Sequence, residues 1–352
     1  MHATLFFVLA TAALLAQALY ILLALFGPGL KYTIVGSPND LGSEEFITVL
    51  EALGDAKLHE QTTVEVLTNG EDYYPAELEA IRGAKKFIHL EAYIFQKGKV
   101  TSEFVAALAE RARAGVQVRM VIDAIGSFST RESFLKELTD AGGNARFYHA
   151  FRWHNFFRIN NRTHRELLII DGEYGFIGGS GWADHWLLNK KRHPRWRDTM
   201  LRVRGDTVNS MQGTFAENWL ECSGEVLADA AFYPACKAPH ARSKTLVINS
   251  APTVNASTRA RVLYQTLLGS AKESICITTP YFLPDQSARN VMVNAMRRGV
   301  KVSILVPGKR SDHLLTRSSS RRLYGELLKA GAEIYEYQPS MLHAKVLIVD
   351  GQ

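Results

Sequence analysis

The chain has 352 residues, of which 47% are hydrophobic and 22% are charged, and its formal net charge at pH 7 is +6. This is ordinary globular composition with room for one large or two medium domains, and the basic balance favours anionic partners. Its three cysteines include no C-x-x-C pair, which argues against a disulfide framework or a zinc site.

The N-terminus carries a long apolar run. Residues Ala3 to Phe26 contain no charged side chain, and Gln17 is the only strongly polar one. A helix of this length spans a hydrocarbon core of about 30 Å. A cleaved signal peptide is the alternative because residues 16–18 read Ala-Gln-Ala, but no Lys or Arg precedes the run, and it continues past this site. We therefore expect residues 1–30 to form a transmembrane anchor, whose orientation the sequence does not fix.

Residues 31–60 are expected to form a linker or short cap, and beyond them the sequence repeats itself. The first copy contains the segments FIHLEAYIF (87–95), VQVRMVID (116–123) and HRELLIIDG (164–172). The second contains SICITTPYF (274–282), VKVSILVP (300–307) and HAKVLIVDG (343–351). The elements follow in the same order in both copies, which predicts two similar structural units.

Each copy predicts strands that alternate with helices. The repeated segments are rich in Ile, Val, Tyr and Phe, and helical patterns that end at Gly115 and Gly299 separate them. Such βαβ units imply a largely parallel sheet. We therefore predict an α/β fold of two similar lobes, 61–235 and 244–352, each a mixed, mostly parallel sheet flanked by helices.

The second copy stops early in the repeat. In the first copy, Asp171-Gly172 is followed by a predicted strand and a glycine-rich turn, whereas Asp350-Gly351 is followed only by Gln352. A sheet without that strand has an unpaired edge. The second lobe is therefore expected to be incomplete, with a native chain that continues past Gln352.

The most reactive pattern is His343-x-Lys345 followed by Asp350, an H-x-K-x4-D motif. A His and a Lys two residues apart on a strand project from the same face and suit a phosphate, since imidazole can attack or protonate and ammonium balances charge. A lone strand histidine is more often structural. The repeat changes this balance, because His164 and Asp171 recur with the same spacing in the first copy. Two such histidines can meet across the lobes, one attacking phosphorus and the other protonating the leaving oxygen.

These paired motifs resemble those of the phospholipase D superfamily. Three neighbouring segments narrow the resemblance to the cardiolipin synthase branch, namely TTPYFLPD (278–285), WRDTMLRVRGDTV (196–208) and FAENWLE (215–221). The resemblance implies that both motifs build one site and that a phosphohistidine intermediate forms without a cofactor or an obligatory metal. The catalytic residues that it implies are His164, His343, Lys345, Asp171 and Asp350.

Two positions depart from the family pattern. Glu166 replaces the first lysine, and Gly181 stands where an asparagine is usual. An ionised glutamate cannot donate to a phosphate oxygen and repels it. Arg162 is expected to supply the missing cation, since strand alternation points Arg165 to the opposite face. The alternative is a degenerate first motif and an inactive protein.

Four residues are predicted to bind substrate or support the site. They are Arg162, Glu166, Asp184 and Tyr281. Asp184 follows the glycine turn where the family carries an acid, and it could hold a histidine Nδ1–H; its alternative is a loop carboxylate that caps a turn. Tyr281 could line the cleft or pack in the core. Basic clusters at 190–197 and 297–322 suit an anionic headgroup, or are merely solvated.

The leading prediction is a phosphatidyl transferase or phosphodiesterase in a bacterial cell membrane, anchored by a single pass, with an anionic phospholipid as substrate. A membrane-bound nuclease of the same superfamily is the first alternative, although the anchor and the synthase-like segments argue against nucleic acid. A catalytically inactive scaffold that binds anionic lipid is the second. The sequence sets neither the acceptor alcohol nor the oligomeric state.

Overall fold

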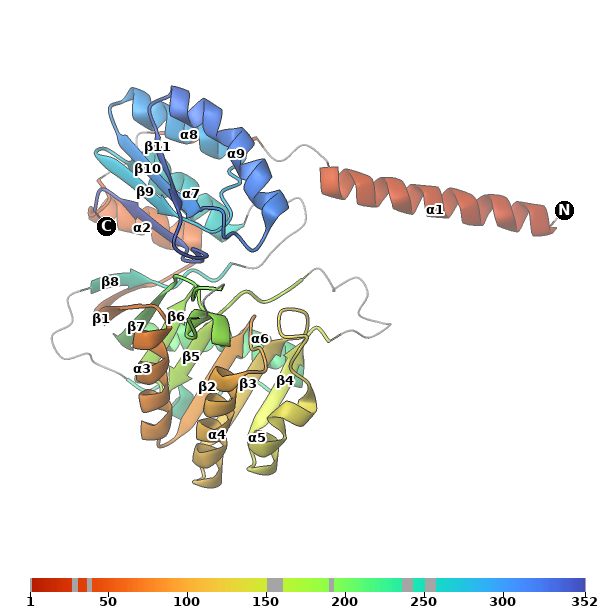
Figure 1. The fold of residues 1–352 in the computed structure, drawn as a ribbon, viewed down its shortest axis with the longest axis vertical. Coiled ribbons are helices and arrows are strands. Elements are labelled where there is room, and N and C mark those ends of the chain that lie inside the picture. Colours follow the sequence, from red (N-terminus) through yellow and green to blue (C-terminus); the bar gives the residue numbers. More distant parts are fainter. Residues whose placement is uncertain are drawn as a thin grey trace.

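The computed structural model describes residues 2–26, 31–36, 40–150, 161–189, 193–235, 243–250 and 258–351. Two α/β lobes face each other, and helix α1 (His2–Phe26) extends away from both (Figure 1). Helix α2 (Glu44–Gly54), from the predicted linker or cap, packs against α7 of the second lobe.

The first lobe is built on eight strands in the order β4-β3-β2-β5-β6-β7-β1-β8. These strands are β1 (Leu58–Thr68), β2 (Phe87–Ala92), β3 (Gln117–Asp123), β4 (Asn144–Tyr148), β5 (Leu167–Ile170), β6 (Tyr174–Gly178), β7 (Thr199–Gly205) and β8 (Ser243–Leu246). Its helices are α3 (Gly70–Gly83), α4 (Lys99–Arg113), α5 (Lys136–Asp140) and α6 (Thr207–Ser223).

The second lobe is built on four strands in the order β11-β10-β9-β12. They are β9 (Ser274–Thr278), β10 (Lys301–Pro307), β11 (Glu333–Tyr337) and β12 (Val346–Val349). Its helices are α7 (Arg259–Ser270), α8 (Gln286–Arg297) and α9 (Leu314–Lys329).

The two sheets share one four-strand pattern. Strand β2 pairs parallel with β3, β3 pairs parallel with β4, and β5 pairs antiparallel with β2. In the second lobe β9, β10, β11 and β12 repeat these pairings. Gly115 and Gly299 follow α4 and α8 with φ of 88° and 96°, a conformation that suits glycine at a helix end. The predicted α/β fold with mixed sheets is therefore confirmed.

The expectation of a mostly parallel sheet is wrong for the first lobe. Strand β5 pairs antiparallel with β6, β6 with β7, β7 with β1, and β1 with β8. The prediction followed the βαβ repeat alone, but the first lobe adds strands joined outside that repeat. Antiparallel pairs therefore outnumber parallel ones in this sheet.

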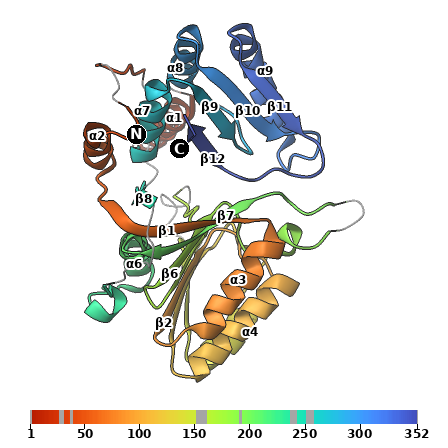
Figure 2. The ribbon, with the colours of Figure 1, turned by 90° about the vertical axis from the view of Figure 1, so that its left-hand side faces the viewer.

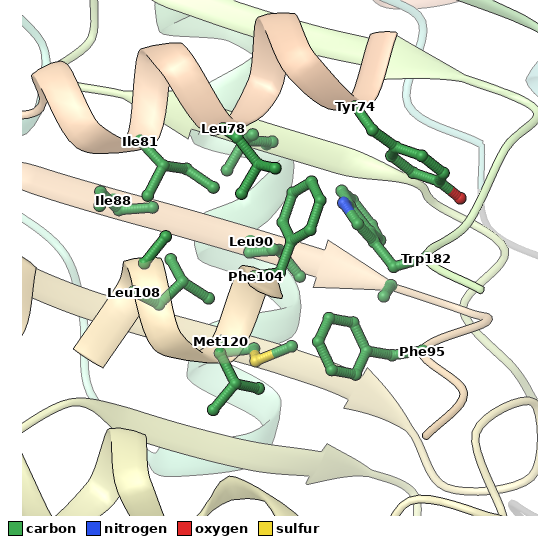
Figure 3. Packing of buried hydrophobic residues seen from close by; sticks show 14 of the residues in the cluster. Tyr74, Leu78, Ile81, Ile88, Leu90, Phe95, Phe104, Leu108, Met120 and Trp182 are labelled. Carbon is green, nitrogen blue, oxygen red and sulfur yellow. The ribbon is translucent and has the colours of Figure 1, made fainter. Parts of the chain in front are cut away.

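The main core lies between the larger sheet and helices α3 and α4, while α6 covers the other face (Figure 2). Leu78 and Ile81 of α3 meet Phe104 and Leu108 of α4 over Leu90 of β2 (Figure 3). The spacings of three and four residues place these side chains on one helix face. Cover on both faces buries every residue of β2, including the polar His89 and Glu91.

Helix α1 stands apart from this packing. Its described side chains include Leu14 and Leu15, each 66% exposed. Within the described residues, no helix combines the length and the hydropathy that crossing a membrane requires. The predicted transmembrane anchor is therefore not confirmed.

A short backbone bridge joins the lobes. The Arg197 N–H donates to the Met341 carbonyl, and the His343 N–H donates to the Arg197 carbonyl, each at 2.8 Å. These bonds fix the segment before β7 against the segment before β12. One of the two bonds is donated by the backbone of His343, which is a predicted catalytic residue.

Candidate active site

His343 lies buried just before β12 and is held by the opposite lobe. Its Nδ1 atom is 2.9 Å from Oδ2 of Asp198, which is fully buried in the first lobe. Asp198 in turn accepts the Trp186 indole N–H at 3.0 Å and its neighbour's backbone N–H, that of Thr199, at 2.8 Å. A carboxylate on Nδ1 fixes the tautomer and leaves Nε2 free to exchange a proton.

Aromatic rings enclose this histidine. Trp196 and Trp186 lie with ring centroids 5.4 and 5.6 Å from the His343 ring, and Tyr281 lies 6.3 Å away, edge to face. The Tyr281 hydroxyl donates to Asp312 at 2.7 Å. Tyr281 therefore lines the cleft and does not pack in the core. The hydrogen bond to Asp312 fixes the direction of its ring.

Lys345 is the cation of this site. Its Nζ atom lies 3.3 Å from both ring nitrogens of His343, so the two motif side chains do share one side of the chain. Although part of Lys345 is exposed, desolvation in the cleft lowers its pKa, and the charges of Asp198, Glu166 and Asp312 oppose this shift. An ammonium at this place can bind a phosphate oxygen beside the imidazole.

His164 precedes β5 and has different surroundings. It is exposed, and its ring stacks on Tyr93 with centroids 4.0 Å apart. Desolvation lowers the pKa of His164, Asp123 opposes this, and the charge of Lys345 lowers the pKa further. The charge of Lys345 in the second lobe thus lies close enough to affect the pKa of His164 in the first lobe.

Glu166 and Gly181, the two departures from the family pattern, lie at one place. Oε1 of Glu166 accepts the Ile94 backbone N–H at 3.1 Å. A Cβ atom at Gly181 would lie 2.9 Å from the same Oε1 and 2.4 Å from the Ile94 carbonyl oxygen. Burial raises the pKa of Glu166 well above its usual range, which favours the neutral acid. The two substitutions therefore fit each other, and a neutral carboxyl does not repel phosphate.

The contacts of Arg162 do not favour its predicted role as the replacement cation. Its guanidinium pairs with buried Asp123 at 3.4 Å and donates to the His149 carbonyl at 3.0 Å. It would have to give up these partners to bind a phosphate. Arg165 faces α6 instead, where it donates to the Thr214 carbonyl at 2.7 Å.

Among the residues that the structure describes, Asp184 bonds a backbone N–H and no histidine ring. Its Oδ1 accepts the Val100 backbone N–H at 2.9 Å, at the start of α4. Here the carboxylate satisfies one of the free N–H groups of a helix N-terminus. The sequence interpretation of a capping loop carboxylate is therefore correct, and Asp198 performs the role that was assigned to Asp184.

The two motif aspartates do not lie at the reactive ends of their strands. Asp171 accepts the backbone N–H groups of residues 85–87 at 2.7–2.8 Å, and Asp350 accepts those of residues 272–274 at 2.8–2.9 Å. Both have a positive φ, 53° and 51°. Each holds the beginning of the first repeat strand of its lobe, opposite the histidine end of β5 or β12. The expectation that they are catalytic is replaced by this structural role.

Sequence reasoning missed Asp198 and Tyr93. Asp198 stands in the segment WRDTM, which was noted only for its resemblance, and its partner is 145 positions away. Tyr93 directly follows β2, at the position where the second copy carries Pro280. A signal for Asp198 existed, because an acid between Trp196 and a β-strand is costly to bury unless it has a partner.

Only part of the basic clusters can be placed. Lys190, Lys191 and Arg192 lie outside the described residues. Arg195 pairs with Glu71. In the second cluster, Arg317 and Arg321 share Glu336, whereas Lys309 and Arg310 are exposed after β10.

Two matched α/β lobes with a His-Lys pair, a second histidine and a bridging acid define a phospholipase D-like protein. The family described as "Cardiolipin synthase, PLD-like domain" matches residues 78–208 and 264–352, and the chain belongs to this family. Cardiolipin synthase 1 of Bacillus anthracis is 34% identical over 310 residues, which cover 86% of this chain and 60% of the relative. The cardiolipin synthase of Oceanobacillus iheyensis is 35% identical over 315 residues, with coverage of 89% and 65%.

The chain thus spans 60–65% of the length of these curated relatives. Among solved structures, phosphatidylserine synthase of Haemophilus influenzae Rd KW20 aligns with a TM-score of 0.60 at 16% identity, covering 86% of this chain and 80% of that one. Polyphosphate kinase of Porphyromonas gingivalis aligns with a TM-score of 0.51 at 10% identity, with coverage of 93% and 45%. At these identities the likeness concerns the fold alone.

Proposed function

We propose that the protein transfers phosphatidyl groups between phospholipid headgroups through a phosphohistidine, as a cardiolipin synthase-like enzyme. The observation that carries the proposal is the contact of Asp198 with His343 across the lobes, with Lys345 beside it. A charged acid behind one imidazole nitrogen stabilises the protonated ring. Membership of the family supports the same reaction.

His164 is the proposed nucleophile. Its lowered pKa keeps the imidazole neutral near pH 7, so that a nitrogen lone pair is available. This nitrogen attacks the phosphorus of the donor lipid while the bond to the first alcohol breaks. The departing oxygen takes a proton from Nε2 of His343, and Lys345 balances the charge of the phosphate oxygens.

The second half of the reaction reverses these roles. An acceptor alcohol gives its proton to Nε2 of His343 and attacks the phosphohistidine. The P–N bond breaks, which restores neutral His164 and releases the new phosphodiester. Water in place of the alcohol would give hydrolysis. Glu166, as a neutral acid beside the cleft, is proposed to donate a hydrogen bond to the substrate in place of the missing lysine.

The proposed setting is a bacterial cell membrane, with α1 as a single-pass anchor. The uncharged stretch Ala3–Phe26 forms one helix apart from the lobes. Beside the cleft, Leu314 and Leu315 at the start of α9 are 70% and 86% exposed, and exposed Lys309 precedes them. In the first lobe, strand β3 takes the place that β10 has in the second lobe, and Phe128, which follows β3, is 78% exposed. Exposed apolar side chains next to cations suit an anionic lipid surface.

One assay separates this proposal from its alternatives. The full-length protein would be incubated with vesicles that contain radiolabelled phosphatidylglycerol, and separately with plasmid DNA. We expect cardiolipin and glycerol as products and intact plasmid. Cleaved plasmid without a lipid product would establish the nuclease alternative. Vesicle binding without turnover of either substrate would establish the inactive scaffold, which Glu166 and Gly181 otherwise suggest.

A further inference from the structure

A deep cavity adjoins the catalytic lysine in the second lobe. It has a volume of about 520 Å³ between α7, α8 and β9, and Lys345 and Tyr281 are among the residues that line it. Its walls are mainly apolar. The side chains that line it include Leu268, Ile277, Phe282, Leu283, Ala288 and Met292. This volume lies within the range of about 300–1,000 Å³ that is typical of sites for small ligands.

The outer end of this cavity meets the segment that follows α1. Tyr32 lines it there, and a second cavity of about 300 Å³ shares Tyr32, Arg261 and Gln265 with the first. The second cavity continues along Ile34 and Val35. The two cavities thus adjoin along Tyr32, Arg261 and Gln265, and we call them together the trough, which is lined from Lys345 to residues 32–35.

The charged groups where the cavities meet satisfy one another. Arg261 pairs with Asp285, and its guanidinium lies 4.5 Å from the centroid of the Tyr32 ring. The Tyr32 hydroxyl lies 3.3 Å from Asp285. A neutralised pair covered by an aromatic ring presents little net charge to a passing ligand. The trough therefore keeps its apolar character past this point.

A different cavity lies beside the other histidine. It encloses about 460 Å³, and its lining includes His164, Arg162, Arg165, Glu217 and Asn218. These polar and charged groups suit a hydroxylated headgroup. The site thus has an apolar side at Lys345 and a polar side at His164.

We infer that the trough binds an acyl chain of the phospholipid whose phosphate lies at Lys345. This inference rests on the proposed phosphatidyl transfer. An acyl chain is the part of such a lipid that gains free energy by leaving water for an apolar wall. The trough leads from Lys345 toward residues 32–35, which follow the apolar N-terminal helix closely in the sequence. Headgroup binding falls to the polar cavity.

The test uses substrates that differ only in chain length. The full-length enzyme and two variants would act on dihexanoyl- and dioleoyl-phosphatidylglycerol, with kcat/KM as the measure. Ala288→Trp fills the trough from α8, and Asn290→Trp adds the same ring to an exposed position of the same helix outside the trough. We expect Ala288→Trp to lower kcat/KM for the dioleoyl lipid by about tenfold while the dihexanoyl value stays within about twofold. Asn290→Trp should change neither.

Equal losses on both lipids, or no loss on either, would overturn the acyl-chain assignment. Absence of turnover of both lipids by the unaltered enzyme would instead refute the proposed function. A second measurement does not depend on the folding of a variant. Phosphatidylglycerol with a mid-chain diazirine should, on illumination, label the unaltered enzyme within residues 261–268, 277–292 or 32–35, which line the trough. Labelling confined to other segments would contradict the inference.

Discussion

The two lobes repeat one topology but give their histidines opposite surroundings. His343 is buried and bonded to Asp198, whereas His164 is exposed to the cleft and stacked on Tyr93. A bonded carboxylate favours the charged imidazolium, and desolvation without such a bond favours the neutral ring. One duplicated motif is thus proposed to supply a proton carrier at His343 and a nucleophile at His164, because the neighbours of the two rings differ.

The interiors of the lobes differ as well. The first lobe buries five carboxyl groups, those of Glu77, Glu91, Asp123, Glu166 and Asp198. Within the described residues, the second lobe buries no carboxyl group to this extent. Burial raises the pKa of Glu77 to about 8 and that of Glu91 to about 7. The first lobe therefore carries the polar framework of the site, while the second lobe contributes mainly the His-Lys pair.

The largest expected effect comes from removing either histidine. His164→Ala and His343→Ala should each lower kcat by about 10⁴-fold, and the double variant should lose little more, because the two act as a unit. Acid quenching with phosphorus-labelled lipid distinguishes them. His343→Ala should still accumulate labelled enzyme, and His164→Ala should not. The reverse pattern would exchange the two proposed roles.

Loss of Lys345 should have the next largest effect. Lys345→Ala removes a charge-assisted contact to the phosphate that tightens in the transition state, so the rate should fall on the order of 10²–10³, or about 3–4 kcal/mol. Lys309→Ala, in the exposed basic cluster, is the matched control and should leave turnover of monomeric dihexanoyl lipid unchanged. Similar losses in both variants would indicate a general effect of charge rather than a contact at the site.

Asp198→Asn tests the asymmetry of the histidines directly. An amide keeps the shape but no longer stabilises the charged ring, so we expect a loss of about 10²-fold in kcat and a displaced pH-rate profile. Asp184→Asn is the control, since Asp184 caps α4. It should cost about 1 kcal/mol of unfolding free energy and leave the profile in place. A displaced profile in Asp184→Asn would contradict these assignments.

Glu166→Gln should have a smaller effect on rate. Glutamine keeps an oxygen for the Ile94 N–H and still donates a hydrogen bond, so activity should stay within about tenfold. Where Glu166 ionises at alkaline pH, its charge raises the pKa of Lys345. Glu166→Gln removes this charge, so the alkaline limb of kcat/KM should move to lower pH. An alkaline limb that moved upward, or a total loss of activity, would show that Glu166 has a different role.

The smallest effect on activity is expected at the matched aspartates. Asp171→Ala and Asp350→Ala should each cost about 1–3 kcal/mol of unfolding free energy, since each frees three backbone N–H groups, with kcat little changed below the melting temperature. Burial of Asp350 raises its pKa, but the three N–H groups outweigh this and lower it overall. Its stabilising contribution is therefore present at neutral pH and is lost as pH falls through the folded pKa. A large fall in kcat of folded protein would restore a catalytic role.

Much of the fold could be predicted because the repeat carries local signals. The apolar segments 167–170 and 346–349 form strands β5 and β12, and the motif aspartates Asp171 and Asp350 follow them directly. The added antiparallel strands of the first lobe have no counterpart in the repeat, so the copied pattern gave no information on their direction. Local sequence patterns thus predict the helices and strands of each copy and their order along the chain. The pairing of the strands outside the repeat depends on long-range contacts.

The site was harder to predict for two physical reasons. The prediction for Arg162 assumes that a strand runs through it, but β5 begins only at Leu167, so the alternating side-chain geometry does not extend to Arg162. The acid that holds His343 was sought near the motif at Asp184, whereas contact across the lobes brings in Asp198. Such pairs arise from lobe packing, which no pattern along the chain specifies.

The bridge between Arg197 and the His343 segment has a consequence for biosynthesis. The acid and the backbone clamp belong to the first lobe, and the histidine that they position belongs to the second. Domains generally fold in order of synthesis. A newly made first lobe therefore has His164 but lacks His343. On the proposed mechanism, phosphatidyl transfer starts only once the second lobe has emerged, folded and docked.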